Sequence, residues 1–282
     1  MAITGFSALT DSNYAALVES QVVLELRPAN TSREFLRFAA KGPSNVANFP
    51  LYGDVGPSVS FTDDVTDYTT VTAMSDTAVA ATAAENGLRI DVSDLVRATH
   101  VQNIVADAAA MLVRSNAEKW EADLAALMDD FSNVTTAAST FTPVDLLSAV
   151  SALEQRDIPG PYVGYFDPKQ TGELRNEIAT TTASYQVGDS SNAMVKPFEV
   201  SGFWGNYMGI PIYQTSLVVT TSGLVGGAVF ASKQALGAYE IWSSRVETQR
   251  DASFRSLELI GSQCYGFCEI SDTRGQTVKS VA

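Results

Sequence analysis

One long helical pattern, from Asp91 to about Phe131, most constrains how this chain folds. At 1.5 Å per residue, an uninterrupted helix over this range is about 60 Å long, well beyond the usual globular helix. We expect Asp91 to cap its first turn and Asp94 to lie at the positive end of its dipole. Its apolar residues fall on two faces about half a turn apart, and the change occurs around residues 114–116. The two halves of the helix should therefore pack against different layers, unless the helix bends.

The segment before this helix is polar and rich in Thr, Ser, Ala and Asp. Short alternating pieces at residues 59–62 and 69–72 predict two extended strands. Their apolar positions are few and mostly small, and a two-stranded ribbon of this kind is marginal alone in water. We therefore expect the ribbon to find its apolar cover on another copy of the molecule.

Charge is unevenly distributed along the chain. The 282 residues carry a formal net charge of −14, which disfavours non-specific binding to nucleic acid or to anionic membranes. The stretch from Pro43 to Leu88 contains no Lys or Arg, whereas the residues before it form the densest basic stretch. The acidic side chains of this stretch are Asp54, Asp63, Asp64, Asp67, Asp76 and Glu85, and the basic ones before it are Arg27, Arg33, Arg37 and Lys41. This separation predicts that the acidic ribbon meets a basic surface on another subunit.

The residue types that usually carry catalysis are scarce. His100 is the only histidine, and a lone histidine on a helix is more typical of a structural or surface position. No Cys/His spacing indicates a metal site, and the glycines at 223–227 lack the Gly-Lys-Ser/Thr ending of a phosphate loop. Asp63 and Asp64 could bind a divalent ion with Asp67, but a solvated acidic turn is the better interpretation. The sequence predicts no cofactor.

Two cysteines, Cys264 and Cys268, lie in a segment that alternates like a strand. Four residues along a strand separate Cα atoms by roughly 13 Å, which is too far for a disulfide. We expect both to be buried structural thiols.

The remainder of the chain alternates between helical and extended patterns. Thr142-Pro143 begins a helix that reaches about Arg156, and Asp167-Pro168 begins another that reaches about Ile178. Pro211 indicates an edge strand or the start of a strand. The predicted strands are 162–166, 209–213, 228–231, 245–250 and 254–270, with a short helix at 233–238. This order indicates an α/β or α+β layered fold.

Three segments in this order resemble the major capsid proteins of tailed bacteriophages, the family with the HK97-type fold. The first, residues 87–96, is similar to the junction between that family's extended loop and its spine helix. The second, residues 202–213, resembles a strand of the family's axial domain. The third runs from Gly227 through Asp251 to the strand around Tyr265.

The resemblance implies a domain layout: an N-terminal arm at 1–41, an E-loop at 42–90, and an axial domain at 140–240. A peripheral domain would combine the spine helix at 91–139 with strands and a C-terminal return at 241–282. In this family, arm and E-loop reach neighbouring subunits. The residues that would do so here are Phe61, Asp63, Asp64, Asp67 and Tyr68 of the E-loop, and Arg27, Arg33, Arg37 and Lys41 of the arm.

The implied function is a shell subunit that forms hexamers and pentamers of an icosahedral head around double-stranded DNA. The head would assemble in the host cytoplasm without a membrane, and an acidic wall would keep DNA from adhering. No isopeptide cross-link is expected, because the E-loop has no lysine between Pro43 and Leu88. The chain begins directly with its arm, so a separate scaffolding protein is expected, with a portal and decoration protein as further partners.

Two other functions remain open on sequence alone. One is an encapsulin-like nanocompartment of the same fold, which would enclose a protein cargo rather than a genome. The other is an α/β enzyme that uses carboxylates such as Asp167 or Glu173.

Overall fold

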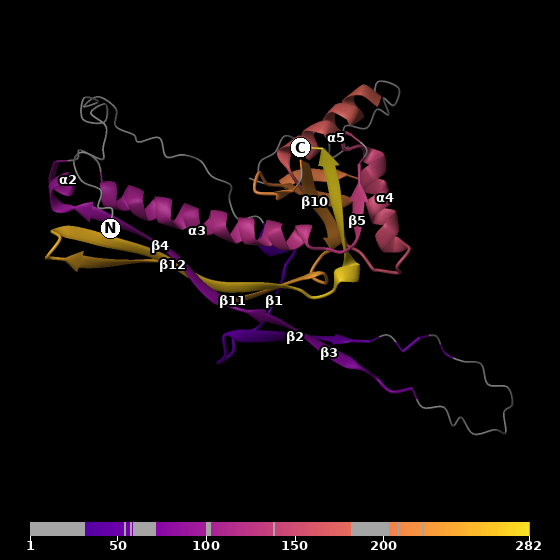
Figure 1. Ribbon diagram of the computed structural model, residues 1–282, viewed down its shortest axis with the longest axis horizontal. Coiled ribbons are helices and arrows are strands. Elements are labelled where there is room, and N and C mark those ends of the chain that lie inside the picture. Colours follow the sequence, from indigo (N-terminus) through magenta and orange to yellow (C-terminus); the bar gives the residue numbers. More distant parts are fainter. Residues whose placement is uncertain are drawn as a thin grey trace.

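The computed structural model describes residues 32–53, 55–56, 58, 72–99, 103–137, 139–181, 203–207, 209–221 and 223–281. The molecule is elongated (Figure 1). A long helix runs along a narrow sheet, a second sheet with two helices occupies one end, and a two-stranded ribbon crosses on the side of the narrow sheet away from the long helix. The fold is thus mixed α+β, as the sequence predicts.

The narrow sheet has four strands in the order β1-β11-β12-β4. Its centre is a long antiparallel hairpin, β11 (Leu236–Asp251) with β12 (Ser256–Glu269). β4 (Ala84–Ser93) is antiparallel to β12, and the two-residue β1 (Arg37–Phe38) pairs in parallel with β11. The hairpin confirms the two strands predicted at 245–250 and 254–270.

The second sheet has seven strands. Its main path is β5-β13-β10-β6-β8-β7, and β9 pairs with β10. The strands are β5 (Val134–Thr136), β13 (Gly275–Val281), β10 (Leu224–Ala231), β6 (Tyr162–Phe166), β8 (Ile210–Gln214), β7 (Phe203–Tyr207) and β9 (Thr220–Thr221). The helices α4 (Pro143–Glu154) and α5 (Pro168–Thr181) belong to this end of the molecule (Figure 1).

Local signals place most of these elements correctly. α4 begins with a capping box, in which the Thr142 hydroxyl accepts from the Asp145 amide and the Asp145 carboxylate accepts from the Thr142 amide. Pro211 does not mark an edge, because β8 lies between β6 and β7. It does lie at the strand start, and pairing with β6 begins only at Ile212.

The short helix predicted at 233–238 is wrong. Residues 232–235 form a turn, and β11 begins at Leu236. Leu236 and Ala238 are fully buried and pair with β12, so sheet packing overrides the local helical preference.

The uninterrupted helix predicted from Asp91 to Phe131 is also wrong. Asp91 lies in β4 opposite Glu258 and does not cap a helix; its carboxylate is paired with Arg89 at 2.7 Å. A short helix, α2 (Asp94–Thr99), follows. The long helix is α3 (Ile104–Asp129), 26 residues capped by Asn103, whose side chain accepts from the Ala106 amide at 3.4 Å. The alternation of Ile90 and Val92, which pack under α3, outweighs the helical pattern at its start.

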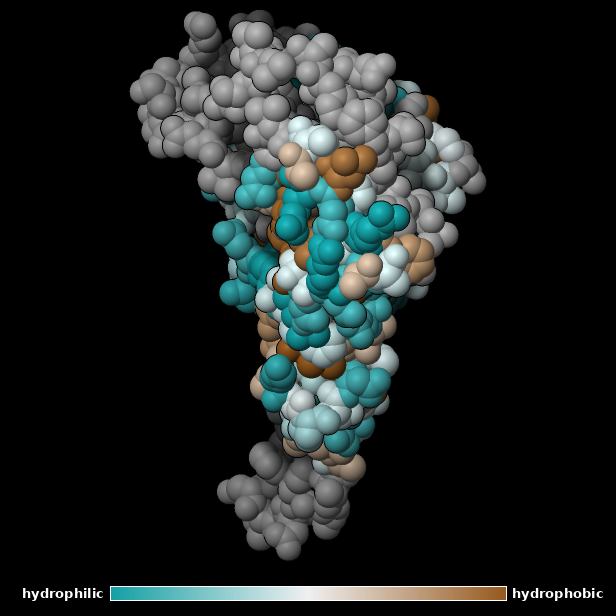
Figure 2. Space-filling view, turned by 90° about the vertical axis from the view of Figure 1, so that its left-hand side faces the viewer, coloured by the Kyte–Doolittle hydropathy of each residue, from teal (hydrophilic) through white to brown (hydrophobic). Residues whose placement is uncertain are grey.

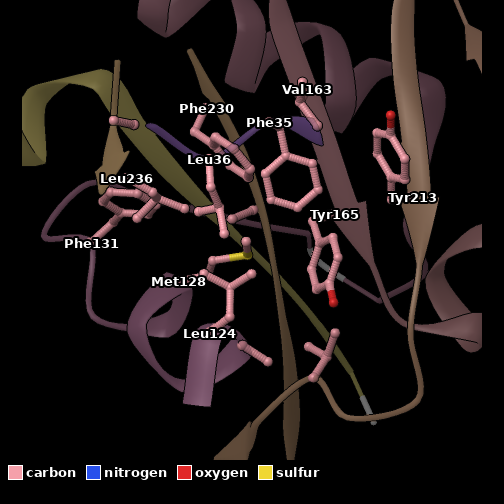
Figure 3. Packing of buried hydrophobic residues seen from close by; sticks show 14 of the residues in the cluster. Phe35, Leu36, Leu124, Met128, Phe131, Val163, Tyr165, Tyr213, Phe230 and Leu236 are labelled. Carbon is pink, nitrogen blue, oxygen red and sulfur yellow. The ribbon is translucent and has the colours of Figure 1, made fainter. Parts of the chain in front are cut away.

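The two halves of α3 do pack against different layers, as predicted. Ala108 and Leu112 in the first half lie on the four-stranded sheet with Leu259. Leu124 and Met128 in the second half enter the large cluster between the two sheets, where Figure 3 shows them below Leu36 and Phe35.

The last strand belongs to the seven-stranded sheet. β13 lies between β10 and β5 in the seven-stranded sheet, not beside β12. The region 241–282 therefore contributes to both sheets, and a division at residue 240 does not follow them. Long-range pairing of this kind leaves no local signal in the sequence.

Candidate assembly surfaces

A two-stranded ribbon precedes β4, but its strands are not the pieces predicted at 59–62 and 69–72. β2 (Val46–Tyr52) and β3 (Asp76–Thr82) pair antiparallel over seven residues each, from Val46 opposite Thr82 to Tyr52 opposite Asp76. The pieces predicted as strands at 59–62 and 69–71 lie outside the described residues, and Thr72 is not in a strand.

The root of the ribbon is covered by its own chain. Phe49 is 2% exposed and Ala81 is fully buried, and they pack with Tyr239, Cys264 and neighbouring residues of the four-stranded sheet. Gly266 permits this approach, because a Cβ there would lie 2.1 Å from the Thr82 carbonyl oxygen. The expectation that the ribbon finds its apolar cover on another copy is therefore wrong for the root.

The outer end of the ribbon is different. Tyr52 is 65% exposed, Val55 54% and Met74 70%. We define the outer end by these three residues. The predicted contact residues beyond it, Phe61, Asp63, Asp64, Asp67 and Tyr68, lie outside the described residues.

The predicted basic arm divides into two parts. Arg27 lies outside the described residues. Arg33 donates two hydrogen bonds to Glu240, at 2.9 and 2.7 Å, and its guanidinium lies 4.7 Å from the Trp120 ring centroid. The hydrogen bond to Glu240 raises the pKa of Arg33 above its usual value. Arg33 is thus engaged within its own subunit.

Arg37 and Lys41 remain on the surface. The Arg37 guanidinium lies 5.9 Å from the Phe49 ring centroid, above a groove between β1 and β2. The groove has a volume of about 360 Å³ and includes Tyr239 in its lining, whose hydroxyl donates to the Ser44 carbonyl at 2.6 Å. This groove is the place where a basic side chain and the ribbon root meet.

Residues 35–36 were not expected in the core. Phe35 is 1% exposed and Leu36 2%. The available signal was the apolar pair itself, enclosed between Arg33 and Arg37 in a basic stretch.

The residues considered for enzyme chemistry have structural partners. The Asp167 carboxylate accepts from the Lys169 amide at 2.7 Å, and the Glu173 carboxylate accepts from the Phe141 amide at 2.7 Å. Among the described residues, no group of three His, Cys, Asp or Glu side chains is placed to hold a metal ion. His100 lies outside them.

The cysteines are buried free thiols, as predicted. Burial raises the pKa of Cys268 to about 11 and also raises that of Cys264. Such thiols are poor nucleophiles at neutral pH, because the thiolate is the reactive form.

The exposed surface is mainly polar at the α2 end. Figure 2 shows this end largely hydrophilic, with small, separate apolar areas.

Helix α4 exposes two apolar side chains. Val144 is 71% exposed and Leu147 40%, three residues apart on one helix face. Within the described ranges, no helix combines the length and the apolar character needed to cross a membrane.

Sequence comparison identifies no relative: no family model matches the chain, and no curated protein matches it. Structural comparison does. A structure of Mycobacterium phage Che8 matches with a TM-score of 0.73 and 19% identity, over 93% of this chain and 95% of that one. The capsid of Ralstonia phage GP4 matches with a TM-score of 0.74 and 10% identity, over 94% of each chain.

A third similar structure is the capsid of the cyanophage P-SCSP1u, with a TM-score of 0.72 and 14% identity over 96% of this chain and 94% of that one. These matches extend over nearly the whole of each chain. The protein therefore has the HK97-type fold of phage capsid proteins.

Proposed function

We propose that this chain is the major capsid protein of a bacteriophage, which assembles as hexamers and pentamers into an icosahedral head around double-stranded DNA. The observation that carries the proposal is the match to phage capsids over more than nine-tenths of both chains. Its work is association, and no catalytic step is assigned to it.

The shape of the subunit supports association through many modest contacts. The outer end of the ribbon exposes Tyr52, Val55 and Met74. Helix α4, beside the seven-stranded sheet, exposes Val144 and Leu147. Single patches of this size are weak. Permanent interfaces commonly bury more than about 2,000 Å², so several such patches on each copy would act together.

Charge supports a specific pairing between copies. Arg37 and Lys41 are exposed beside the groove at the ribbon root, whereas Arg33 already has Glu240 as a partner. The acidic residues of the E-loop, Asp63, Asp64 and Asp67, would face this basic pair on a neighbouring subunit, with Phe61 and Tyr68 adding apolar contact. Complementary charge favours encounter and register more than raw affinity.

A charge exchange tests this pairing. Asp63→Lys with Asp64→Lys should weaken assembly more than the stability of the isolated subunit. Adding Arg37→Glu and Lys41→Glu to the same chain should restore assembly, because the pairing is then reversed in sign. Equal losses of assembly and subunit stability, or no rescue, would contradict the pairing.

The remaining partners follow from the same proposal. A separate scaffolding protein would guide assembly, a portal would occupy one vertex, and a decoration protein could bind outside. The net charge of −14 would keep the packaged DNA from adhering to the wall without sequence-specific binding. Assembly would take place in the host cytoplasm.

The purified chain gives the direct test of function. Size-exclusion chromatography and negative-stain imaging should show capsomers or closed shells, alone or with a co-expressed scaffolding protein. A monomer with a saturable small-molecule site would overturn the proposal in favour of an enzyme. Shells filled with a specific protein and never with DNA would overturn it in favour of a nanocompartment.

A further inference from the structure

A short N-terminal segment, residues 32–38, joins the two sheets. It begins with one turn of 3-10 helix, η2 (Ser32–Glu34), and ends in β1. The Phe35 ring lies 5.7 Å from Tyr165 of β6, 5.3 Å from Tyr213 of β8 and 5.2 Å from Phe230 of β10, measured between ring centroids. Figure 3 shows Phe35 and Leu36 among these side chains.

The same segment also binds the four-stranded sheet. β1 pairs with β11, with Arg37 opposite Gly237 and Phe38 opposite Ala238. Seven consecutive residues thus contact three strands of one sheet and the edge of the other. Two residue pairs between β1 and β11 alone are a weak attachment, because short strands contribute little stability.

A buried carboxylate secures the start of this segment. Glu121 of α3 is 1% exposed, and Ser32 is fully buried. One Glu121 oxygen accepts from the Ser32 amide at 3.3 Å and from the Ser32 hydroxyl at 3.0 Å. The other accepts from the Tyr165 hydroxyl of β6. The Ser32 hydroxyl in turn accepts from the Trp120 indole N–H at 3.0 Å.

This arrangement attaches the N-terminal segment to the core through Glu121. A buried carboxylate is costly unless donors satisfy it, and here Ser32 of the N-terminal segment and Tyr165 of β6 both donate to Glu121. Burial and the neighbouring Glu121 raise the pKa of Tyr165 well above its usual value, so its hydroxyl remains a donor. Withdrawing Ser32 would remove two hydrogen bonds to Glu121 and the acceptor of the Trp120 indole N–H inside the core.

We propose that Glu121 is a positioning residue that locks residues 32–38 into the joint between the two sheets. It thereby fixes the position of Ser32, the first described residue, which is joined to residues 1–31. The use of residues 1–31 between subunits rests on the function proposed above; the lock itself does not.

Amide hydrogen exchange on unassembled subunits tests the lock. Ser32→Ala and Glu121→Ala should each speed exchange of the amides at 33–38 at least tenfold, while the amides of β10 exchange as in the wild type. Tyr165→Phe is the matched control, because it removes a donor to the same carboxylate and leaves both bonds from Ser32 in place. It should leave exchange at 33–38 unchanged.

Wild-type protection at 33–38 in Ser32→Ala would overturn the proposal, as would equal release by Tyr165→Phe. If Glu121→Ala does not fold, Ser32→Ala decides, since it removes only one hydroxyl. These measurements are made before assembly, so a negative result leaves the capsid function standing. Failure of the wild type to form shells would in turn leave the lock standing.

Discussion

The root and the outer end of the β2–β3 ribbon belong to the same two strands but have opposite surroundings. At the root, Phe49 and Ala81 are buried against β11 and β12 of their own chain. At the outer end, Tyr52 and Met74 are 65% and 70% exposed. In the isolated subunit, the root of the ribbon is thus covered by the four-stranded sheet, whereas the outer end is not.

The difference shows what each half contributes. The root fixes the direction of the ribbon in the folded subunit, because it packs against β11 and β12 of the main hairpin. The outer end contributes little to subunit folding, so its side chains are available for contact with other copies.

The largest effect is expected from Phe49→Ala. Truncating a fully buried phenylalanine removes its transfer free energy and leaves a cavity, and we expect a loss of about 3–5 kcal/mol. Chemical denaturation of the unassembled subunit measures it. A loss below about 1 kcal/mol would mean that the ribbon root is not part of the folded core.

Gly266→Ala should have the next largest effect. The added Cβ would lie 2.1 Å from the Thr82 carbonyl oxygen and 2.5 Å from its carbon, which are backbone atoms that cannot rotate away. The ribbon root must then lift from β12, and overpacking of this kind costs about 1–3 kcal/mol. Gly42→Ala is the control, since a Cβ there meets nothing within 4 Å. Equal stability of the two variants would contradict the close approach.

Much of the division between layers could be predicted from sequence, because it depends on local signals. The Thr142-Pro143 pair predicted the start of α4, and the change of apolar face near residues 114–116 predicted that the two halves of α3 pack against different layers. The helix start failed because residues 88–92 fit both an alternating and a helical pattern. Other features depend on partners far away in the chain, which no local pattern encodes. They are the burial of residues 32–38, the position of β13 and the packing of the ribbon root on β11 and β12.

A smaller effect is expected from the ionisation of Glu269, which makes the stability of the subunit near the ribbon root depend on pH. Glu269 lies between Cys268 and Ile270, which pack under the root. Burial, with the negative charges of Asp272 and Asp130, raises the pKa of Glu269 from 4.5 to about 7. Below pH 4.5 it is protonated whether folded or unfolded. Between pH 4.5 and 7 it ionises first in the unfolded chain, so its effect on stability grows more unfavourable up to pH 7 and is complete above it.

Glu269→Gln removes this charge. Relative to the wild type, it should gain about 1 kcal/mol at pH 8 and much less at pH 4.5, a value reduced for the partial exposure of the group. Denaturation at both pH values measures the difference, and titration of other carboxylates cancels in the comparison. The same difference at both pH values would show that Glu269 is not held protonated by its surroundings.

The smallest change in subunit stability is expected at the outer end. Tyr52→Ala with Met74→Ala should alter the free energy of unfolding by less than about 0.5 kcal/mol for each substitution, because both side chains are largely in solvent. Assembly should nevertheless decrease, since each copy would lose apolar contact at every interface that uses this end. The measurement is the fraction of chain in shells at increasing protein concentration, with Phe254→Ala, exposed at the far end of the main hairpin, as the matched control. Normal assembly of the double variant would mean that the outer end is not a contact surface, and the contrast with the root would then be one of exposure alone.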